Sequence, residues 1–364
     1  MRVLVLWANP KATNLGVQAL AGGTEALARR AWGSDTRVEF QDFASGTDKH
    51  TQFGGRSVLR DIGTRRPITE RLQHFDVVVD TGGGDSFTDI YGMRRISTIH
   101  YVHRVCHRLG LPLILGPQTV GPFSHPVVRR LAQHSVRIAH TVIARDSTSL
   151  VAAEELQSTR VALATDVVFA LPQPVSLAQK RDVIINVSGL LWNNNPHVDS
   201  AKYRRMTVEL IDSLLATGRG VSLLAHVLSN DSKDNDVPAV EELGARYRDR
   251  VEVVIPESLD GVRSILASAN IVVGARMHAS LNALSVGTPA IPWAYSRKFS
   301  PLMNDLGWAT VQDLRSDDFV VPHTVEFVEG ASELKSDVAS VLARTNVRLD
   351  AAEQAFREAI SPDM

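Results

Sequence analysis

The chain has 364 residues, of which 44% are hydrophobic and 22% charged, and its formal net charge is -1. This length exceeds what one hydrophobic core ordinarily serves, so two domains are expected. The near-neutral charge excludes the global basic field of a nucleic-acid-binding protein while leaving room for local patches, and the single cysteine, Cys106, excludes an internal disulfide or a cysteine-rich metal site.

The chain opens with a short apolar run at residues 2–7, which is predicted as a strand. This run is too short for the apolar part of a signal peptide. No later run approaches the length of a membrane span, so we expect a cytoplasmic protein without an integral membrane segment. A polar loop at 8–14 and a helical pattern then form the first half of a βαβ unit. Asn14 in this loop is a candidate ligand contact, with a plain connector as the alternative. Residues 42–66 lack a clear period, and an irregular segment is expected there.

A second strong strand, at 76–80, runs into a turn with three successive glycines. Glycines without side chains let the backbone approach a ligand closely, so Gly83 and Gly84 are candidate contacts. Their spacing matches neither the dinucleotide fingerprint nor a P-loop. Asp85 follows directly and is a candidate base or sugar ligand, with a helix cap as the alternative.

Three histidines, His100, His103 and His107, fall on one helical pattern at 96–109. No nearby glutamate completes a hydrolytic zinc pattern, so we expect solvated helix surface and no metal site.

The next two strand ends of the first half also carry polar residues. Gln118 lies in a proline-bounded loop after one strand and is a candidate ligand contact. Arg145 follows the other strand and is a candidate anion contact, with a structural ion pair to Asp146 or Asp166 as an equal alternative.

A linker with two prolines at 171–180 divides the chain. Since each half repeats strand, loop and helix, we predict an α/β fold of two doubly wound, Rossmann-like domains, at 1–175 and 180–325, with an interdomain cleft. A C-terminal helix at about 344–361 is a candidate to pack back on the first domain.

In the second half, a strand at 183–187 ends in the polar loop 188–195, which mirrors the loop at 8–14. Trp192 and Asn193 in this loop are therefore candidate ligand contacts. His226 ends a later strand and is a secondary candidate.

Residues 270–307 are the most informative stretch. An apolar strand gives way to a helical pattern after Gly274, so Arg276 and His278 fall at a helix N-terminus, where free N–H groups favour anions. Lys298 falls at the neighbouring strand end, and open parallel sheets bind ligands at such ends. The sequence thus predicts a cation-rich anion site.

Taken together, these segments resemble the polysaccharide pyruvyltransferase family. The family's pattern of an apolar strand, Gly-x-Arg-x-His, Gly-x-Pro, and a Tyr and Lys is matched by residues 271–278, 287–289, Tyr295 and Lys298. Further matches lie at 80–84, 116–123, 144–147 and 165–166. The opening loop departs from the family's Gly-Asn-x-Gly-Asp/Glu, since this chain has Thr13-Asn14-Leu15-Gly16-Val17.

The resemblance implies a GT-B-like fold and transfer of a pyruvyl group from phosphoenolpyruvate to a saccharide as a ketal, without a cofactor. The donor-binding residues would be Arg276, Lys298, Arg145, Gly83 and Gly84. As a hypothesis, His278 is the general acid and Asp85 takes a hydroxyl proton. The acceptor contacts would be Asn14, Gln118, Trp192 and Asn193.

The alternative function is a GT-B nucleotide-sugar glycosyltransferase. It is disfavoured because no carboxylate lies between Tyr295 and Asn304 to bind a ribose. The sequence leaves open the acceptor's identity, whether it is lipid-linked, and the oligomeric state.

Overall fold

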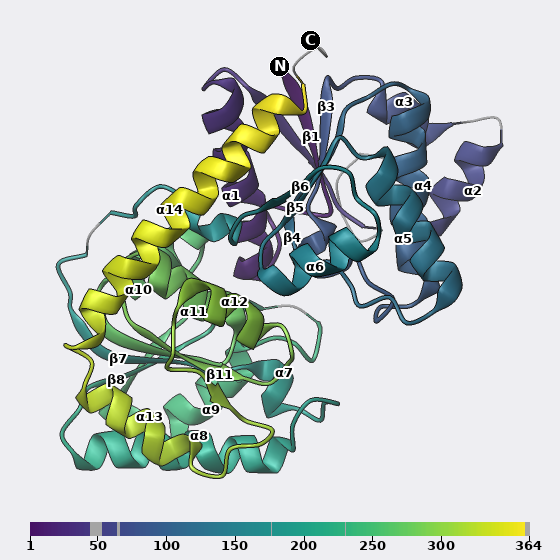
Figure 1. Ribbon diagram of the computed structural model, residues 1–364. Helices are drawn as coiled ribbons and strands as arrows, with labels where there is room; N and C mark the ends of the chain where they lie inside the picture. Colours follow the sequence, from purple (N-terminus) through teal and green to yellow (C-terminus); the bar gives the residue numbers. More distant parts are fainter. Residues whose placement is uncertain (44–52, 64–65, 176, 230, 361–364) are drawn as a thin grey trace. The chain divides into compact units, whose positions relative to one another are not determined.

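The computed structural model describes residues 1–43, 53–63, 66–175, 177–229 and 231–360 (Figure 1). The chain forms two compact units, each assembled from separate segments. Unit 1 comprises Met1–Pro10, Leu20–Leu171 and Thr345–Met364, and unit 2 comprises Lys11–Ala19 and Pro172–Arg344. Two helices, α1 (Leu15–Trp32) and α14 (Leu334–Glu358), therefore begin in unit 2 and continue in unit 1.

Unit 1 is built on a parallel sheet of six strands in the order β2-β1-β3-β4-β5-β6. Its strands are β1 (Arg2–Leu6), β2 (Arg37–Gln41), β3 (Val77–Asp80), β4 (Leu113–Gln118), β5 (Thr141–Ala144) and β6 (Val161–Leu163). Its other helices are α2 (Gly55–Ile62), α3 (Pro67–Leu72), α4 (Met93–Arg108), α5 (Pro126–Ile138), α6 (Ser147–Glu155) and the 3-10 helices η1 (Gly82–Gly84) and η2 (Val167–Ala170).

Strand β1 shows why helices cover both faces of this sheet. Side chains alternate along a strand, so Val3 and Val5 enter one apolar cluster while Leu4 and Leu6 enter another. The first cluster includes residues of α1 and the end of α14, and the second includes residues of α4 and α5. All four side chains are fully buried, as expected for a central parallel strand.

Unit 2 repeats the plan with the strand order β12-β11-β10-β7-β8-β9, again parallel. Its strands are β7 (Arg181–Asn186), β8 (Val221–Leu224), β9 (Val251–Val254), β10 (Ala269–Gly274), β11 (Ala290–Ala294) and β12 (Gln312–Asp313). Its helices are α7 (Gly189–Trp192), α8 (Ser200–Ala216), α9 (Val237–Tyr247), η3 (Arg248–Arg250), α10 (Leu259–Ala267), α11 (Met277–Ser285), α12 (Phe299–Leu306) and α13 (Val320–Glu329).

Two local expectations were wrong. The segment predicted as irregular contains helix α2, while residues 44–52 and 64–65 of it lie outside the described residues. Of the histidines expected on the surface, His103 is fully buried and its Nε2 lies 2.7 Å from Oδ2 of Asp80, and Nδ1 of His100 lies 3.0 Å from Oγ of Ser135. In the described part of the chain, no helix is both long and apolar enough to cross a bilayer.

Candidate functional site

The N-terminus of α11 is the centre of the polar site in unit 2. Strand β10 ends at Gly274, where a Cβ would collide with Oγ of Ser280, so the glycine lets the helix begin directly beside the strand. His278 is half-buried at the second position of α11. One turn later, Nδ2 of Asn282 donates to the His278 carbonyl (2.8 Å) and lies 3.4 Å from Nε2 of His226.

Arg276, the N-cap of α11, does not have a guanidinium available to an anion. Its Nη1 and Nη2 each lie 2.6 Å from a carboxylate oxygen, of Asp234 and Asp236 respectively, and the residue is 7% exposed. Burial alone would lower the pKa of Arg276, but the charges of Asp236 and Asp234 outweigh it and hold that pKa above its ordinary value. This geometry argues against the predicted role in donor binding and makes Arg276 a structural residue of the helix cap.

Asp236 connects three parts of unit 2 at the carboxyl edge of its sheet. Its Oδ1 accepts from the backbone N–H of Gly189 (2.7 Å), and its Oδ2 accepts from those of His226 (3.0 Å) and Val227 (2.9 Å). With the Arg276 pair, this fully buried carboxylate joins the start of α7, the end of β8 and the start of α11. Asp236 therefore positions the segment that carries His278.

The N-terminal segment around Asn14 belongs to the same site. The Leu15 N–H donates to the His226 carbonyl (3.1 Å), and Oδ1 of Asn14 accepts from the Gly16 N–H (2.9 Å). A Cβ at Gly16 would lie 2.9 Å from Nδ1 of His278. The structure thus brings together the predicted residues Asn14 and His278, which are 264 positions apart in the sequence.

Lys298 lies at the end of the neighbouring strand, as the sequence predicted, and is half-buried at the N-cap of α12. Burial lowers the pKa of His197, and the charge of Lys298 lowers it further. The His197 and Tyr295 rings are 5.3 Å apart. His197 was not identified from the sequence, since it lies in a loop without a motif.

The pKa of His226 gives a pH prediction. Burial, followed by the charges of His278 and Arg276, lowers it to about 3. In the unfolded chain the pKa is about 6.5, so as the pH falls below that value the unfolded state takes up a proton that the folded state does not. His226 should therefore reduce the unfolding free energy by about 1.4 kcal/mol per pH unit between pH 6 and pH 4.

Chemical denaturation of the wild type and of His226→Asn, measured from pH 4 to pH 8, checks this. The difference in unfolding free energy between the two proteins should be constant above pH 7 and shrink on acidification. The matched control is His323→Asn at an exposed histidine of unit 2. Parallel curves for wild type and His226→Asn would contradict the prediction.

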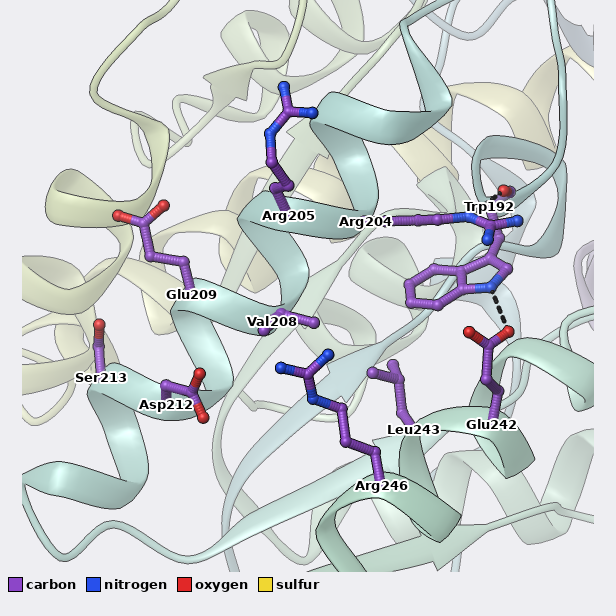
Figure 2. Close-up of a pocket in the computed structure, with 10 residues that line it drawn as sticks. All are labelled: Trp192, Arg204, Arg205, Val208, Glu209, Asp212, Ser213, Glu242, Leu243 and Arg246. Atoms are coloured by element: carbon purple, nitrogen blue, oxygen red, sulfur yellow. Dashed lines mark hydrogen bonds between the residues drawn. The ribbon is translucent and has the colours of Figure 1, made fainter.

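Trp192 and Asn193 have structural contacts that argue against their predicted role. Trp192 is 5% exposed, its Nε1 donates to Glu242 (2.9 Å), and the Arg204 guanidinium lies 5.0 Å from the ring centroid (Figure 2). The ring faces a cavity of about 590 Å³ between α8 and α9, where Arg204 covers it (Figure 2). Nδ2 of Asn193 donates to the carbonyls of Gly189 and Lys233.

Unit 1 has its own buried polar cluster, centred on Arg145. Its Nη1 donates to Oδ2 of Asp166 (3.1 Å), so the structural ion pair is present. Among the described residues, Nε and Nη2 of this 1% exposed side chain have no hydrogen-bond partner. A Cβ at Gly84 would lie 3.8 Å from Nη1 of Arg145, which places the glycine turn beside the guanidinium. Nε of Arg145 also lies 4.0 Å from Oδ2 of Asp146, so the structural ion pairs to Asp166 and Asp146, the alternative to an anion contact, are both present.

The other predicted residues of unit 1 lie around the same turn. Gln118 is fully buried, and its Nε2 donates to the Asp80 carbonyl (3.0 Å), which argues against contact with a saccharide. Gly82 has a φ of +55°, and a Cβ there would collide with Oε1 of Gln118. Asp85 is half-buried and accepts from the Tyr91 hydroxyl (2.8 Å). Within the described ranges, no group of three or more histidine, cysteine or acidic side chains could hold a metal ion.

Comparisons with known proteins bear on the family and the fold of the chain. The amylovoran biosynthesis protein AmsJ of Erwinia amylovora is 23% identical over an alignment of 305 residues, which covers 77% of this chain and 72% of AmsJ. The UDP-GlcNAc 2-epimerase of Neisseria meningitidis, bound to UDP-GlcNAc, matches with a TM-score of 0.59 at 10% identity, over 96% of this chain and 99% of that one. Anabaena HepE in complex with UDP matches with a TM-score of 0.55 at 12% identity, over 99% and 98%.

These structural likenesses confirm the predicted GT-B-like α/β fold class. The model of a family described as polysaccharide pyruvyl transferase matches residues 24–297, a range that includes the glycine turn, Arg145 and α11. The chain therefore belongs to the polysaccharide pyruvyl transferase family.

Proposed function

We propose that this transferase takes its pyruvyl group from phosphoenolpyruvate and places it on a saccharide as a cyclic ketal. Membership of the family supports a transferase that acts in polysaccharide pyruvylation. The observation that carries the proposal furthest is the position of His278. It is half-buried at a helix N-terminus, beside Asn14, with Lys298 at the adjacent strand end. An acid and a cation at such an edge suit a small dianion that must be protonated.

Phosphoenolpyruvate carries a carboxylate and a phosphate, so its site needs N–H donors and fixed cations. In unit 2, we assign donor binding to the first N–H groups of α11 and to Lys298. In unit 1, the donor-binding roles of Arg145, Gly83 and Gly84 stay predictions of the sequence, and Arg145 is already paired with Asp166 and Asp146. Arg276 leaves the donor-binding set, because Asp234 and Asp236 occupy its guanidinium.

The reaction proceeds in three steps in this proposal. His278 gives a proton to the methylene carbon of phosphoenolpyruvate, which becomes a methyl group and leaves an oxocarbenium-like centre at the neighbouring carbon. A first sugar hydroxyl bonds to that carbon and loses its proton to a base, a role for which Asp85 of unit 1 stays a prediction of the sequence. The C–O bond to phosphate then breaks with its electron pair, a second hydroxyl closes the ketal ring, and its proton leaves with phosphate or returns to His278.

Asn14 remains our candidate acceptor contact in unit 2, because its side chain is half-buried next to His278. The contacts of Trp192, Asn193 and Gln118 favour structural roles, so we do not propose these residues as acceptor ligands.

Phosphate release from phosphoenolpyruvate with a panel of saccharide acceptors tests the function. We expect release that depends on the acceptor, and a new ketal methyl signal in the NMR spectrum of the product. Turnover of UDP- or GDP-sugars with no phosphate released from phosphoenolpyruvate would instead support the nucleotide-sugar glycosyltransferase.

Replacing Gly16 with alanine should lower kcat about 100-fold without unfolding the protein. The added Cβ would lie 2.9 Å from Nδ1 of His278, so the imidazole must move, and a displacement of about 1 Å can cost this factor. Steady-state kinetics with phosphoenolpyruvate measure the effect. The matched control is Gly220→Ala in unit 2, where the nearest atom, Cβ of Asp182, is 3.6 Å away. Equal kcat for both variants would contradict the proposed position of the acid.

A further inference from the structure

The helical layer of unit 1 that contains α2, α3, α4 and α5 is strongly basic. Residues 54–140 contain twelve arginines, no lysine, and six aspartates or glutamates. This segment therefore has a formal charge of +6 in a chain whose total is -1, so the rest of the chain has -7. Two of the six acids, Asp61 and Asp80, are buried, which leaves the surface still more positive.

Helices α2, α3 and α4 pack together (Figure 1). A cavity of about 450 Å³ is lined by residues of these helices and of the turn between α2 and α3. Three exposed arginines, Arg66, Arg104 and Arg108, line it. Asp61 is the one acidic residue among the described residues of its lining, and its carboxylate already accepts from two backbone N–H groups and two hydroxyls, at 2.7 to 2.9 Å. The cavity thus has an excess of guanidinium groups, which suit the oxygens of a phosphate.

Large apolar side chains are exposed beside this cavity. On α2, Leu59 is 72% and Ile62 is 67% exposed, and Ile62 also lines the cavity. Ile90 and Tyr91, which are 57% and 47% exposed, precede the opposite end of α4 from the cavity residues Arg104 and Arg108. Soluble proteins rarely leave several such side chains exposed together without a function.

The first turns of α2 and α4 lie close together. A Cβ at Gly55, the first residue of α2, would lie 3.3 Å from Nε of Arg94 at the start of α4. Arginines also alternate with the apolar residues, since Arg56 and Arg60 share α2 with Leu59 and Ile62. We call α2 and the arginine-lined cavity the basic–apolar face.

We propose that the basic–apolar face docks on an anionic lipid surface. The side chains of Leu59 and Ile62 enter the headgroup region, and a lipid phosphate occupies the cavity between Arg66, Arg104 and Arg108. A short helix with basic and apolar residues is the usual means of such interfacial attachment. A soluble polyanion would bind to the arginines alone. Binding of that kind would not explain why Leu59 and Ile62 are exposed. The inference goes beyond the proposed function and does not depend on it.

Sedimentation of the full-length chain with vesicles tests the proposal directly. We expect binding to vesicles that contain phosphatidylglycerol, little binding to pure phosphatidylcholine, and weaker binding as salt is added. Arg104→Gln with Arg108→Gln should weaken vesicle partitioning roughly 30-fold. Leu59→Ser with Ile62→Ser should weaken it about tenfold or more, because these side chains bury apolar surface in the headgroup region.

Matched controls separate this face from general charge and hydrophobicity. Arg248→Gln with Arg250→Gln removes two exposed arginines of unit 2, and Val347→Ser removes an exposed apolar side chain of α14. Both controls should bind as the wild type does, and thermal melts should show that all variants are folded. Loss of binding in the controls would overturn the proposal. The proposal would also be overturned if the Leu59/Ile62 variant bound vesicles fully and a soluble anion displaced the protein from them. Displacement by dextran sulfate would indicate a polyanion site, and displacement by inorganic phosphate would indicate a free-phosphate site.

Discussion

Replacing His278 with alanine is expected to lower kcat for pyruvyl transfer by about 10²–10⁴-fold while leaving the protein folded. His278 is half-buried at the start of α11, within the polar site of unit 2. Its removal leaves the ion pairs of Arg276 and the hydrogen bonds of Asp236 intact, since neither involves the imidazole. Phosphate release under saturating phosphoenolpyruvate measures the change.

The split between kcat and KM distinguishes a general acid from a phosphate ligand. Loss of an acid lowers kcat, because the proton is needed only in the transition state, whereas loss of a ground-state contact raises KM for phosphoenolpyruvate and leaves kcat near its original value. Lys298→Ala is the comparison, and we expect it to raise KM more than it lowers kcat. His323→Ala, at an exposed histidine of unit 2, is the control for the substitution itself. Near-wild-type turnover by His278→Ala would remove this residue as the acid.

The fold class could be predicted from the sequence because the central strands are continuous apolar runs. Val77, Val78 and Val79 are fully buried, as both-face burial in a parallel sheet requires. Strand β2 was missed because it is an edge strand with the sequence RVEFQ, and its inward and outward residues alternate without a strong apolar signal. Such a strand is determined by the neighbour it pairs with, which a single sequence does not reveal.

Arg276 shows which part of a site local sequence patterns do not reveal. The helix N-terminus and its neighbouring His278 follow from local pattern, but the partners of Arg276 lie 40 and 42 residues earlier, in the loop between β8 and α9. The local sequence pattern does not predict which acidic loop contacts a given arginine in the folded chain. The partners of Arg276 are therefore a property of the tertiary structure.

The prediction for His103 was wrong for a different reason, since the sequence does contain a signal that this residue is buried. It lies seven residues after Ile96, four after Ile99 and three before Cys106, so it shares their helical face. The prediction placed His103 on the surface because its side chain is polar. In the structure it is buried with the apolar residues of its helical face, because Asp80 provides a buried partner for its imidazole.

Replacing Asp236 with alanine should reduce the unfolding free energy of unit 2 by about 3–5 kcal/mol, the effect expected when a buried charge loses its partner. Asp236 is fully buried, and its removal leaves three backbone N–H groups without their acceptor. Arg276 would retain Asp234, whose side chain is 34% exposed and therefore a weaker partner. Denaturant unfolding at pH 7 measures the change.

Asp231→Ala is the matched control, because Asp231 is an exposed acid of the same loop and its loss should change the unfolding free energy by less than about 0.5 kcal/mol. A double-mutant cycle with Arg276→Ala separates the ion pair from the backbone hydrogen bonds. If the pair dominates, the double variant should be little less stable than Asp236→Ala alone. If the three N–H bonds dominate, the two losses should add. A loss below about 1 kcal/mol in Asp236→Ala would mean that the start of α7, the end of β8 and the start of α11 are held together by apolar packing, and that Asp236 does not position His278.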